Sequence, residues 1–257
     1  MKRHFNFGHN WKNYSANVLD EECLNDAVES LDTLIGAKRI SGASFLDVGC
    51  GSGIFSIAAK KLGAEIVVGL DISKDSVDTS MHNKKRFAEE EDIQFIKYDI
   101  LDGSDGIEAF DIVYSWGVLH HTGNMWQALI NTMRFVKGNG IYVISIYNKH
   151  WTSPVWLLVK YIYNVSPQFI KMVMVWFFYI IIAFAKFIVT KKNPFLKKRR
   201  GMNFYYDVVD WIGGYPYEYA SKKDIQTFIE KEGYTLIDFN KAEVPTGCNE
   251  YVFRKNG

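Results

Sequence analysis

Three glycines at alternate positions follow an acid at the end of a short apolar run, Phe45-Leu46-Asp47-Val48-Gly49-Cys50-Gly51-Ser52-Gly53. The residues after this run place apolar side chains at helical spacing. An apolar run bounded by glycines is typical of a buried parallel strand, so the unit is a strand, a glycine turn and a helix. In such a unit a ligand lies beyond the carboxyl end of the strand, where glycines let the backbone approach it closely.

The spacing of the glycines separates two classes of ligand. A dinucleotide fingerprint needs a glycine at the sixth position counted from Gly49, where this chain has Ile54. The pattern Asp-x-Gly-x-Gly-x-Gly instead resembles the first motif of class I S-adenosylmethionine-dependent methyltransferases. The resemblance implies S-adenosyl-L-methionine as the cofactor, with the turn beneath its methionine part and Asp47 near its ammonium group.

Two further acids end strands of the same predicted sheet. Asp71 closes the strand over residues 65–71, and a carboxylate at this position can accept hydrogen bonds from both hydroxyls of a ribose. Ile72 is then expected to lie against the adenine. After the strand over residues 93–97, the resemblance implies that Asp99 binds the exocyclic amine of adenine, and that the backbone amide of Ile100 binds a ring nitrogen. The alternative for Asp99 is a carboxylate that caps a short turn.

The N-terminal segment is also similar to one that covers the cofactor in a subset of these methyltransferases. The motif is Phe-Gly-His-Asn-Trp, which ends at Trp11. Trp11 and Tyr14 are therefore candidate contacts, although aromatic side chains in such a leader also serve as packing. The complete set of predicted cofactor contacts is Asp47, Gly49, Cys50, Gly51, Gly53, Asp71, Ile72, Asp99, Ile100, Ser115, Trp11 and Tyr14.

A pair of histidines follows the strand over residues 110–116, at the edge where reacting groups belong in this architecture. Methyl transfer to a hydroxyl requires alignment of the oxygen and removal of its proton, and a histidine near neutral pKa suits the second task. His120 and His121 are the candidate catalytic residues, with a structural role at a strand-to-helix turn as the alternative. Relatives that methylate quinone-ring precursors hold a metal with acids where this chain has Gly117 and His120, so we expect no metal.

The elements that position these residues alternate between strand and helix. This alternation predicts an α/β fold, a doubly wound and mostly parallel Rossmann-like sheet whose last strand is antiparallel. Residues 41–146 and 221–257 form the predicted cofactor-binding domain, behind an N-terminal cap segment over residues 1–40. A helix is expected over residues 124–136, and residues 137–140 are expected to form a turn before the fifth strand. Residues 147–220 are a predicted helical insertion after that strand and a candidate substrate lid.

Composition and charge limit the remaining possibilities. A chain of 257 residues with 48% hydrophobic content can bury a sizeable core. No acid lies between Ile112 and Tyr206, whereas 12 of the 30 lysines and arginines do. So uneven a distribution favours an anionic partner for this stretch. Three scattered cysteines predict neither a disulfide framework nor a zinc cluster, and the basic N-terminus lacks the apolar run of a secretory signal, so we expect a cytoplasmic protein.

The insertion contains an unusually apolar segment. Residues 172–185 carry no charge, and as a helix they would rise about 21 Å, short of the roughly 30 Å hydrocarbon core of a bilayer. A full span would also divide one sheet between two compartments. The sequence therefore favours a buried or interfacial helix, or a re-entrant hairpin with residues 155–163. A basic run from Lys191 to Arg200 follows this helix.

Residues 201–218 and the motif Gly247-Cys248-Asn249-Glu250 resemble a subset of these methyltransferases that is often found in bacterial surface-glycan and lipid-carrier pathways. Together with the charge pattern, this resemblance implies O-methylation of an amphipathic or lipid-linked, glycan-type acceptor at the inner membrane face, with peripheral membrane contact through residues 155–200. One alternative is methylation of a soluble small metabolite, with the apolar helices packed in a closed pocket or in a homodimer. Another is a cofactor-binding adaptor that carries out no chemistry. Nucleic acid is disfavoured as a partner, because the positive charge lies beside apolar residues rather than among exposed stacking residues.

Overall fold

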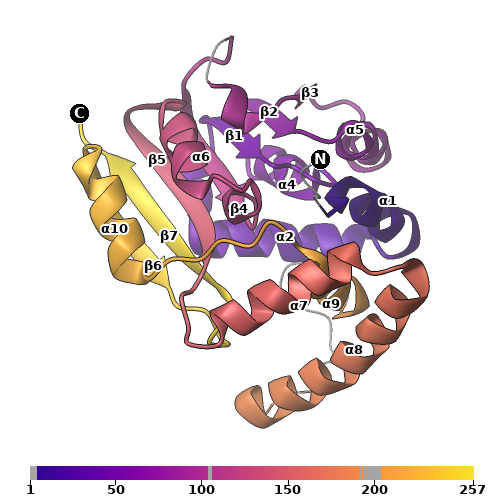
Figure 1. The fold of residues 1–257 in the computed structure, drawn as a ribbon. Coiled ribbons are helices and arrows are strands. Elements are labelled where there is room, and N and C mark those ends of the chain that lie inside the picture. The colour runs from indigo at the N-terminus through magenta and orange to yellow at the C-terminus, as the bar shows by residue number, and fades with distance from the viewer. Residues whose placement is uncertain (1–4, 104–105, 192, 194–203) are drawn as a thin grey trace.

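A seven-stranded sheet lies at the centre of the molecule. The structure, a computed structural model, describes residues 5–103, 106–191, 193 and 204–257. Within these ranges the strands have the spatial order β3-β2-β1-β4-β5-β7-β6 (Figure 1). Their bounds are β1 (Ser44–Val48), β2 (Ile66–Asp71), β3 (Ile93–Lys97), β4 (Phe110–Trp116), β5 (Val136–Tyr147), β6 (Tyr234–Asn240) and β7 (Cys248–Lys255). The β1 to β5 pairs are parallel and β7 runs antiparallel to β5 and β6, which confirms the predicted sheet.

Helices cover both faces of this sheet because successive strand residues point to opposite sides. Phe45 packs with α2 (Glu21–Leu34) and α4 (Ile54–Lys61), whereas Leu46 packs with α6 (Met125–Met133) and α10 (Lys222–Lys231). Helix α5 (Lys74–Phe87) lies beside β3 and α4. The doubly wound arrangement predicted from the sequence is therefore confirmed.

The entry into β5 differs from the prediction. Helix α6 ends at Met133, and the strand begins at Val136 instead of after a turn at residues 137–140. Val136 pairs with Phe110, the register then shifts, and Ile141 pairs with Ile112. Asn139 adopts a left-handed φ of 63°, so the polar glycine-containing segment forms an irregularity inside the strand.

The N-terminal residues have two roles. Helix α1 (Phe7–Asn17) packs on α5, whereas α2 contributes buried side chains to the core beneath the sheet. Asp20 begins α2, since its carboxylate accepts a hydrogen bond from the Cys23 N–H at 2.9 Å. The short elements of the chain are α3 (Ala37–Ile40), η1 (Ile100–Asp102) and η2 (Leu119–His121).

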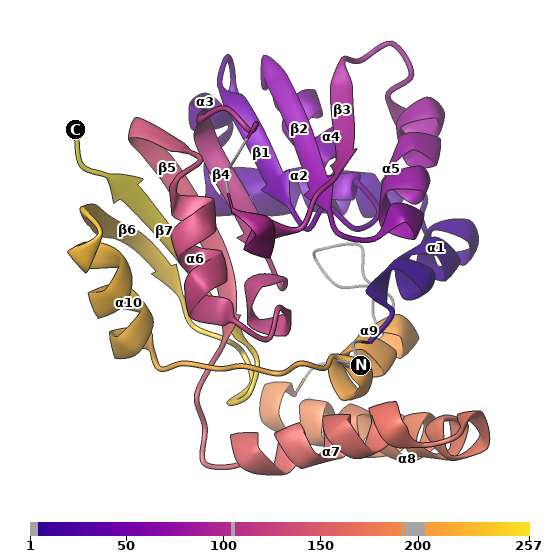
Figure 2. The ribbon, with the colours of Figure 1, turned by 45° about the horizontal axis from the view of Figure 1, so that its top comes forward.

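In its described residues, the chain between β5 and α10 forms the helices α7 (Ser153–Val165), α8 (Gln168–Thr190) and α9 (Phe204–Gly213). Figure 2 shows them as a separate layer beyond one end of the sheet. The segment after α9 returns to the carboxyl ends of β4 and β5, because the N–H of Glu218 donates to the His120 carbonyl and that of Ala220 to the Tyr147 carbonyl. Residues 192 and 194–203, which include most of the predicted basic run, lie outside the described residues.

Helix α8 leaves most of its apolar surface exposed. Its 18-residue window Gln168–Ala185 has a mean hydropathy of 2.0, which makes it long and apolar enough to cross a membrane by length and composition. Its buried residues contact α7 and α9 through Val175 and Ala183. The large apolar side chains that it exposes are Phe169, Ile170, Met172, Val173, Trp176, Phe177, Ile180, Ile181, Phe184, Phe187 and Ile188.

Candidate active site

The glycine turn between β1 and α4 has the predicted geometry. Gly49, Gly51 and Gly53 have φ angles of 77°, 57° and 76°, a region that side chains other than glycine rarely adopt. A Cβ at Gly49 would lie 2.3 Å from the Val118 side chain, and one at Gly51 would lie 3.0 Å from the indole of Trp11. The turn therefore requires glycine for its backbone conformation and for the approach of its neighbours.

Asp71 fastens the end of β2 to this turn. One of its carboxylate oxygens accepts a hydrogen bond from the Gly51 N–H at 3.0 Å, and the other accepts one from the Ser73 N–H at 2.8 Å. Each oxygen keeps lone-pair capacity for a further donor such as a ribose hydroxyl. Burial raises the pKa of Asp71. The side chain of the next residue, Ile72, is 61% exposed, which offers an apolar surface to a base beside the carboxylate.

The end of β3 shows the local role that the sequence left open for Asp99. Its carboxylate accepts a hydrogen bond from the Leu101 N–H at 2.9 Å and so caps η1. Ile100 is buried, and its carbonyl accepts a hydrogen bond from the Asn131 side chain at 2.7 Å. These contacts fix the backbone at this point of the sheet, and the adenine-binding roles of Asp99 and Ile100 stay predictions.

Three of the predicted cofactor contacts turn toward the protein interior. Asp47 is buried and accepts a hydrogen bond from the Ser56 hydroxyl at 2.7 Å. The Ser115 hydroxyl donates to the Val48 carbonyl at 3.0 Å and so links β4 to β1. Cys50 is buried, and burial raises the pKa of its thiol. These side chains support the glycine turn from the protein interior, and their contacts with a cofactor stay predictions.

Asp47 makes the stability of the fold depend on pH. Burial raises the pKa of its carboxyl to about 7, whereas an aspartate in the unfolded chain titrates near about 4. The folded protein therefore binds the proton more tightly, and stability falls as the pH rises from the unfolded to the folded pKa. For Asp47→Asn we expect the free energy of unfolding, relative to the native protein, to rise by about 1–3 kcal/mol between about pH 5 and about pH 8.

Denaturant unfolding at several pH values measures this difference. The matched control is Asp75→Asn, which removes an exposed carboxylate from the first turn of α5. Parallel stability curves for Asp47→Asn and the native protein would contradict the assigned protonation.

The two aromatic residues proposed for the cap segment have different environments. The Trp11 ring lies over Gly51 of the glycine turn, and its contact with a cofactor stays a prediction. Tyr14 is buried, where it makes edge contacts with Trp11 and with Tyr206 of α9. The structure thus uses Tyr14 to pack α1 against the insertion, and its proposed contact with a cofactor stays a prediction.

The histidine pair lies where β4 and β5 meet the insertion. The Nδ1 of His121 lies 2.6 Å from the Pro216 carbonyl, an acceptor only, so Nδ1 carries the proton and Nε2 keeps its lone pair. Burial lowers the pKa of His121 to about 3. His120 is 0% exposed, and the backbone of Ser145 lies near its ring without a hydrogen bond of ordinary geometry to either nitrogen. Both imidazoles are therefore neutral near pH 7.

Sequence reasoning missed one charged residue beside this pair. Lys160 lies on α7 and is 0% exposed. Its ammonium group donates to the Trp211 carbonyl and lies over the rings of Tyr147, Trp211 and Tyr217. The available signal was a single lysine inside the apolar run Trp156-Leu157-Leu158-Val159-Lys160-Tyr161-Ile162.

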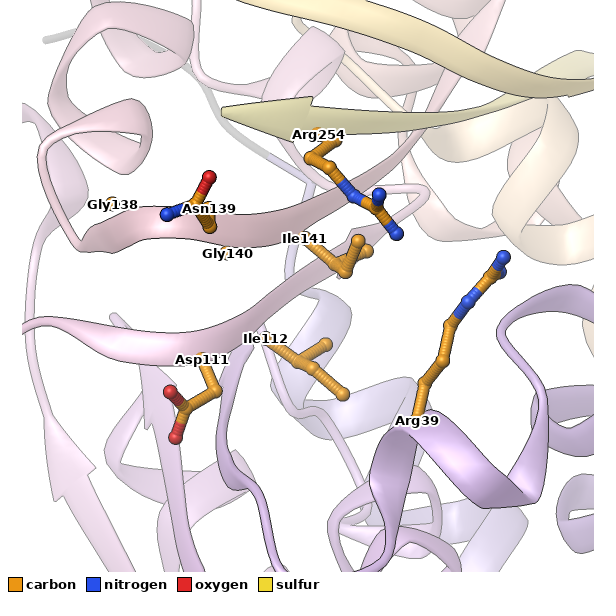
Figure 3. Close-up of a pocket in the computed structure, with 8 residues that line it drawn as sticks. All are labelled: Arg39, Asp111, Ile112, Gly138, Asn139, Gly140, Ile141 and Arg254. Carbon is orange, nitrogen blue, oxygen red and sulfur yellow. The ribbon is translucent and has the colours of Figure 1, made fainter. Parts of the chain in front are cut away.

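An open hollow of about 300 Å³ lies elsewhere on the molecule (Figure 3). Asp111 and Ile112 at the start of β4, the first part of β5, and the side chains of Arg39 and Arg254 line it. This is the opposite end of β4 from the histidines, so the hollow does not belong to the cofactor site. No group of three side chains suited to a metal ion occurs within the described ranges.

The strand order, the glycine turn and the acid at the end of β2 agree with the arrangement that the resemblance to class I S-adenosylmethionine-dependent methyltransferases implies. Residues 46–142 match the family model described as a methyltransferase domain. S-adenosylmethionine is the cofactor of this class, and the residues present fit it. The paired backbone contacts of Asp71 and the exposed Ile72 offer sites for a ribose and a base.

Curated relatives match the same region. Ribosomal protein L11 methyltransferase of Dictyoglomus turgidum is 36% identical over 109 residues, which are 40% of this chain and 32% of that protein. Ubiquinone biosynthesis O-methyltransferase of Coxiella burnetii is 28% identical over 131 residues, or 50% and 55% of the two chains. The chain thus spans about a third to a half of the length of these relatives.

Solved structures extend the similarity of the fold to most of the chain. Magnesium protoporphyrin IX methyltransferase from Synechocystis PCC 6803 with bound SAH superposes with a TM-score of 0.58 at 14% sequence identity. The match covers 91% of this chain and 83% of that one. This match shows that the two chains share a fold, and at 14% identity it carries no information on the acceptor.

Proposed function

We propose that this chain is an S-adenosylmethionine-dependent methyltransferase that methylates an oxygen atom of an amphipathic or lipid-linked acceptor at the cytoplasmic face of a membrane. The observation that carries the cofactor half is the Asp71 carboxylate, which holds the glycine turn through Gly51 and lies beside the exposed Ile72. S-adenosylmethionine supplies an electrophilic methyl group on a sulfonium. The protein's own task is to hold the acceptor oxygen in line with that group.

The residues beyond β4 and β5 support an oxygen acceptor. Because its Nδ1–H is held by the Pro216 carbonyl, His121 offers Nε2 as a hydrogen-bond acceptor for a hydroxyl. Because its pKa is about 3, the His121 imidazole is a weak base and accepts a proton from the hydroxyl poorly. Orientation of the hydroxyl is therefore the role that the geometry supports best, and general-base catalysis by His120 or His121 stays a prediction.

The insertion supports a membrane-bound acceptor. Helix α8 exposes a large apolar surface, and α7 adds the exposed side chains of Leu157, Leu158 and Ile162. Monomeric soluble proteins rarely expose contiguous apolar patches of this kind. No acid occurs between Ile112 and Tyr206, so the same region suits an anionic leaflet.

An interfacial position suits this surface better than a span. Strands β5 and β7 are neighbours in one sheet, so the chain that leaves β5 has to return to the same side of any bilayer. Helix α7, with 13 residues, would rise about 20 Å, which is too short for the return crossing. We therefore place α7 and α8 along the membrane surface.

Methyl transfer into a cell extract tests this proposal. The protein is supplied with S-adenosylmethionine labelled in its methyl group, and the extract is then separated into lipid and water-soluble fractions. We expect label in the lipid fraction, and none with Asp71→Ala as the blank. Label confined to the soluble fraction would point to a small-metabolite acceptor and assign the apolar helices to a second copy of the chain. Absence of label from both fractions would favour the adaptor.

A further inference from the structure

The side-chain amine of Lys160 is buried and forms no ion pair with the residues that the structure describes. No carboxylate lies within 4 Å of it in the described part of the chain. Asp210 acts on it from farther away, and the Asp210 carboxylate itself accepts a hydrogen bond from the Asn10 side chain at 2.8 Å. Buried charges in folded proteins are normally paired, because an unpaired charge loses its hydration without compensation. Burial lowers the pKa of Lys160 to about 7, so an anionic group at this place would stabilise its charged form.

The imidazole of His120 is a second unsatisfied group at the same place. Both of its ring nitrogens are buried without a hydrogen bond, and its ring centroid lies 4.2 Å from that of Tyr147. The Lys160 ammonium lies 5.4 Å from the centroid of the same Tyr147 ring. Lys160 and His120 thus both lie next to Tyr147. The Lys160 ammonium has further N–H donors available, and the neutral His120 imidazole can donate one hydrogen bond and accept another.

We propose that Lys160 and His120 bind a phosphate group of the methyl acceptor, beyond the carboxyl ends of β4 and β5. A phosphate supplies a negative charge that pairs with the Lys160 ammonium. It also supplies acceptor oxygens for an N–H of the neutral His120 imidazole. The inference rests on the proposed function, since it assigns this place to the acceptor. The phosphate belongs to an amphipathic molecule, because Lys160 is carried by α7, whose other side exposes Leu158, Tyr161 and Ile162.

The test is a calorimetric titration of the protein saturated with S-adenosylhomocysteine. The probes are dihexanoyl phosphatidic acid, its uncharged counterpart dihexanoylglycerol, and inorganic phosphate. For Lys160→Met we expect the affinity for dihexanoyl phosphatidic acid to fall about tenfold or more, as for a lost charged hydrogen bond. Dihexanoylglycerol is expected to bind the native and variant proteins equally.

Lys171→Met is the matched control. It removes the same charge from the adjacent helix α8, where the Lys171 ammonium lies 5.6 Å from the centroid of the Tyr163 ring. We expect it to leave the affinity for phosphatidic acid within about twofold of the native value, well below the cost of a lost charged hydrogen bond. If both variants lose the same affinity for dihexanoyl phosphatidic acid, the effect comes from the overall positive charge and the proposal is overturned.

Thermal unfolding gives a readout that a merely structural lysine would not produce. Replacing an unpaired buried charge by an apolar side chain of similar length is neutral or stabilising. Ligand-free Lys160→Met should therefore unfold at the same temperature as the native protein or a few degrees higher, while it binds the phosphate less tightly. A lower unfolding temperature together with unchanged phosphatidic acid affinity would assign Lys160 to the fold.

The remaining outcomes separate this inference from the proposed function. If native protein binds S-adenosylhomocysteine but neither phosphate probe, the phosphate site is wrong and the cofactor site stands. If Lys160→Met weakens S-adenosylhomocysteine binding as much as phosphatidic acid binding, the lysine serves the cofactor and the proposal is overturned. Inorganic phosphate that binds as tightly as phosphatidic acid, with the same dependence on Lys160, supports the site and assigns it to a water-soluble acceptor.

Discussion

Asp71→Asn is expected to weaken the binding of S-adenosylhomocysteine by about ten- to a hundredfold. The change removes the negative charge that would accept hydrogen bonds from a ribose, and a hydrogen bond to a charged group contributes about 1.5–3 kcal/mol. It also disturbs the turn, because an amide has one acceptor oxygen where the carboxylate accepts from both Gly51 and Ser73. Isothermal titration calorimetry measures the affinity directly.

Asp75→Asn controls for the loss of charge in this part of the molecule, since Asp75 is exposed in the first turn of α5. Its affinity for S-adenosylhomocysteine should match that of the native protein. Far-ultraviolet circular dichroism checks that Asp71→Asn is folded at the temperature of the titration. A folded Asp71→Asn variant with native affinity would remove Asp71 from the cofactor site.

The double substitution Phe177→Glu and Ile180→Glu is expected to abolish vesicle binding, with a loss of about thirtyfold or more. The two side chains are 58% and 67% exposed, and burial of such a side chain contributes about 1.5–3 kcal/mol. The added carboxylates would also be repelled by an anionic leaflet. Co-sedimentation with vesicles of phosphatidylcholine and phosphatidylglycerol measures the bound fraction.

Met81→Glu with Ile237→Glu is the matched control, because it adds the same charge at two exposed apolar positions on α5 and β6. We expect this variant to bind vesicles nearly as well as the native protein. Equal binding by both double variants would exclude α8 as the membrane contact. If the native protein forms a dimer in solution and does not bind vesicles, the apolar surface is assigned to contact with a second copy of the chain.

Local sequence patterns predicted the fold, the glycine turn and the position of Asp71 beside it. The glycine turn and Asp71 could be predicted from the sequence because their geometry depends on residues within one strand, turn and helix unit. The three glycines need left-handed φ angles, and the acid at the end of β2 reaches Gly51 because β2 is the parallel neighbour of β1.

The acceptor half depends on contacts that no local pattern contains. Lys160 meets Tyr147, Trp211 and Tyr217 only because α7, α9 and the end of β5 come together in space. The inward orientation of Ser115 and the buried position of Tyr14 likewise follow from tertiary packing. The residue types were visible in the sequence, but their side-chain directions were not.

Helix α7 is a single rigid element with two working faces. Lys160 and Tyr163 are buried on one side, whereas Leu158, Tyr161 and Ile162 are exposed on the other. A ligand that favours one position of this helix and a bilayer that favours the same position act on one equilibrium. Their binding free energies are then coupled, and the coupling is reciprocal. Occupancy of the acceptor site would raise the affinity of the protein for a membrane by the same factor by which the membrane raises the affinity for the acceptor.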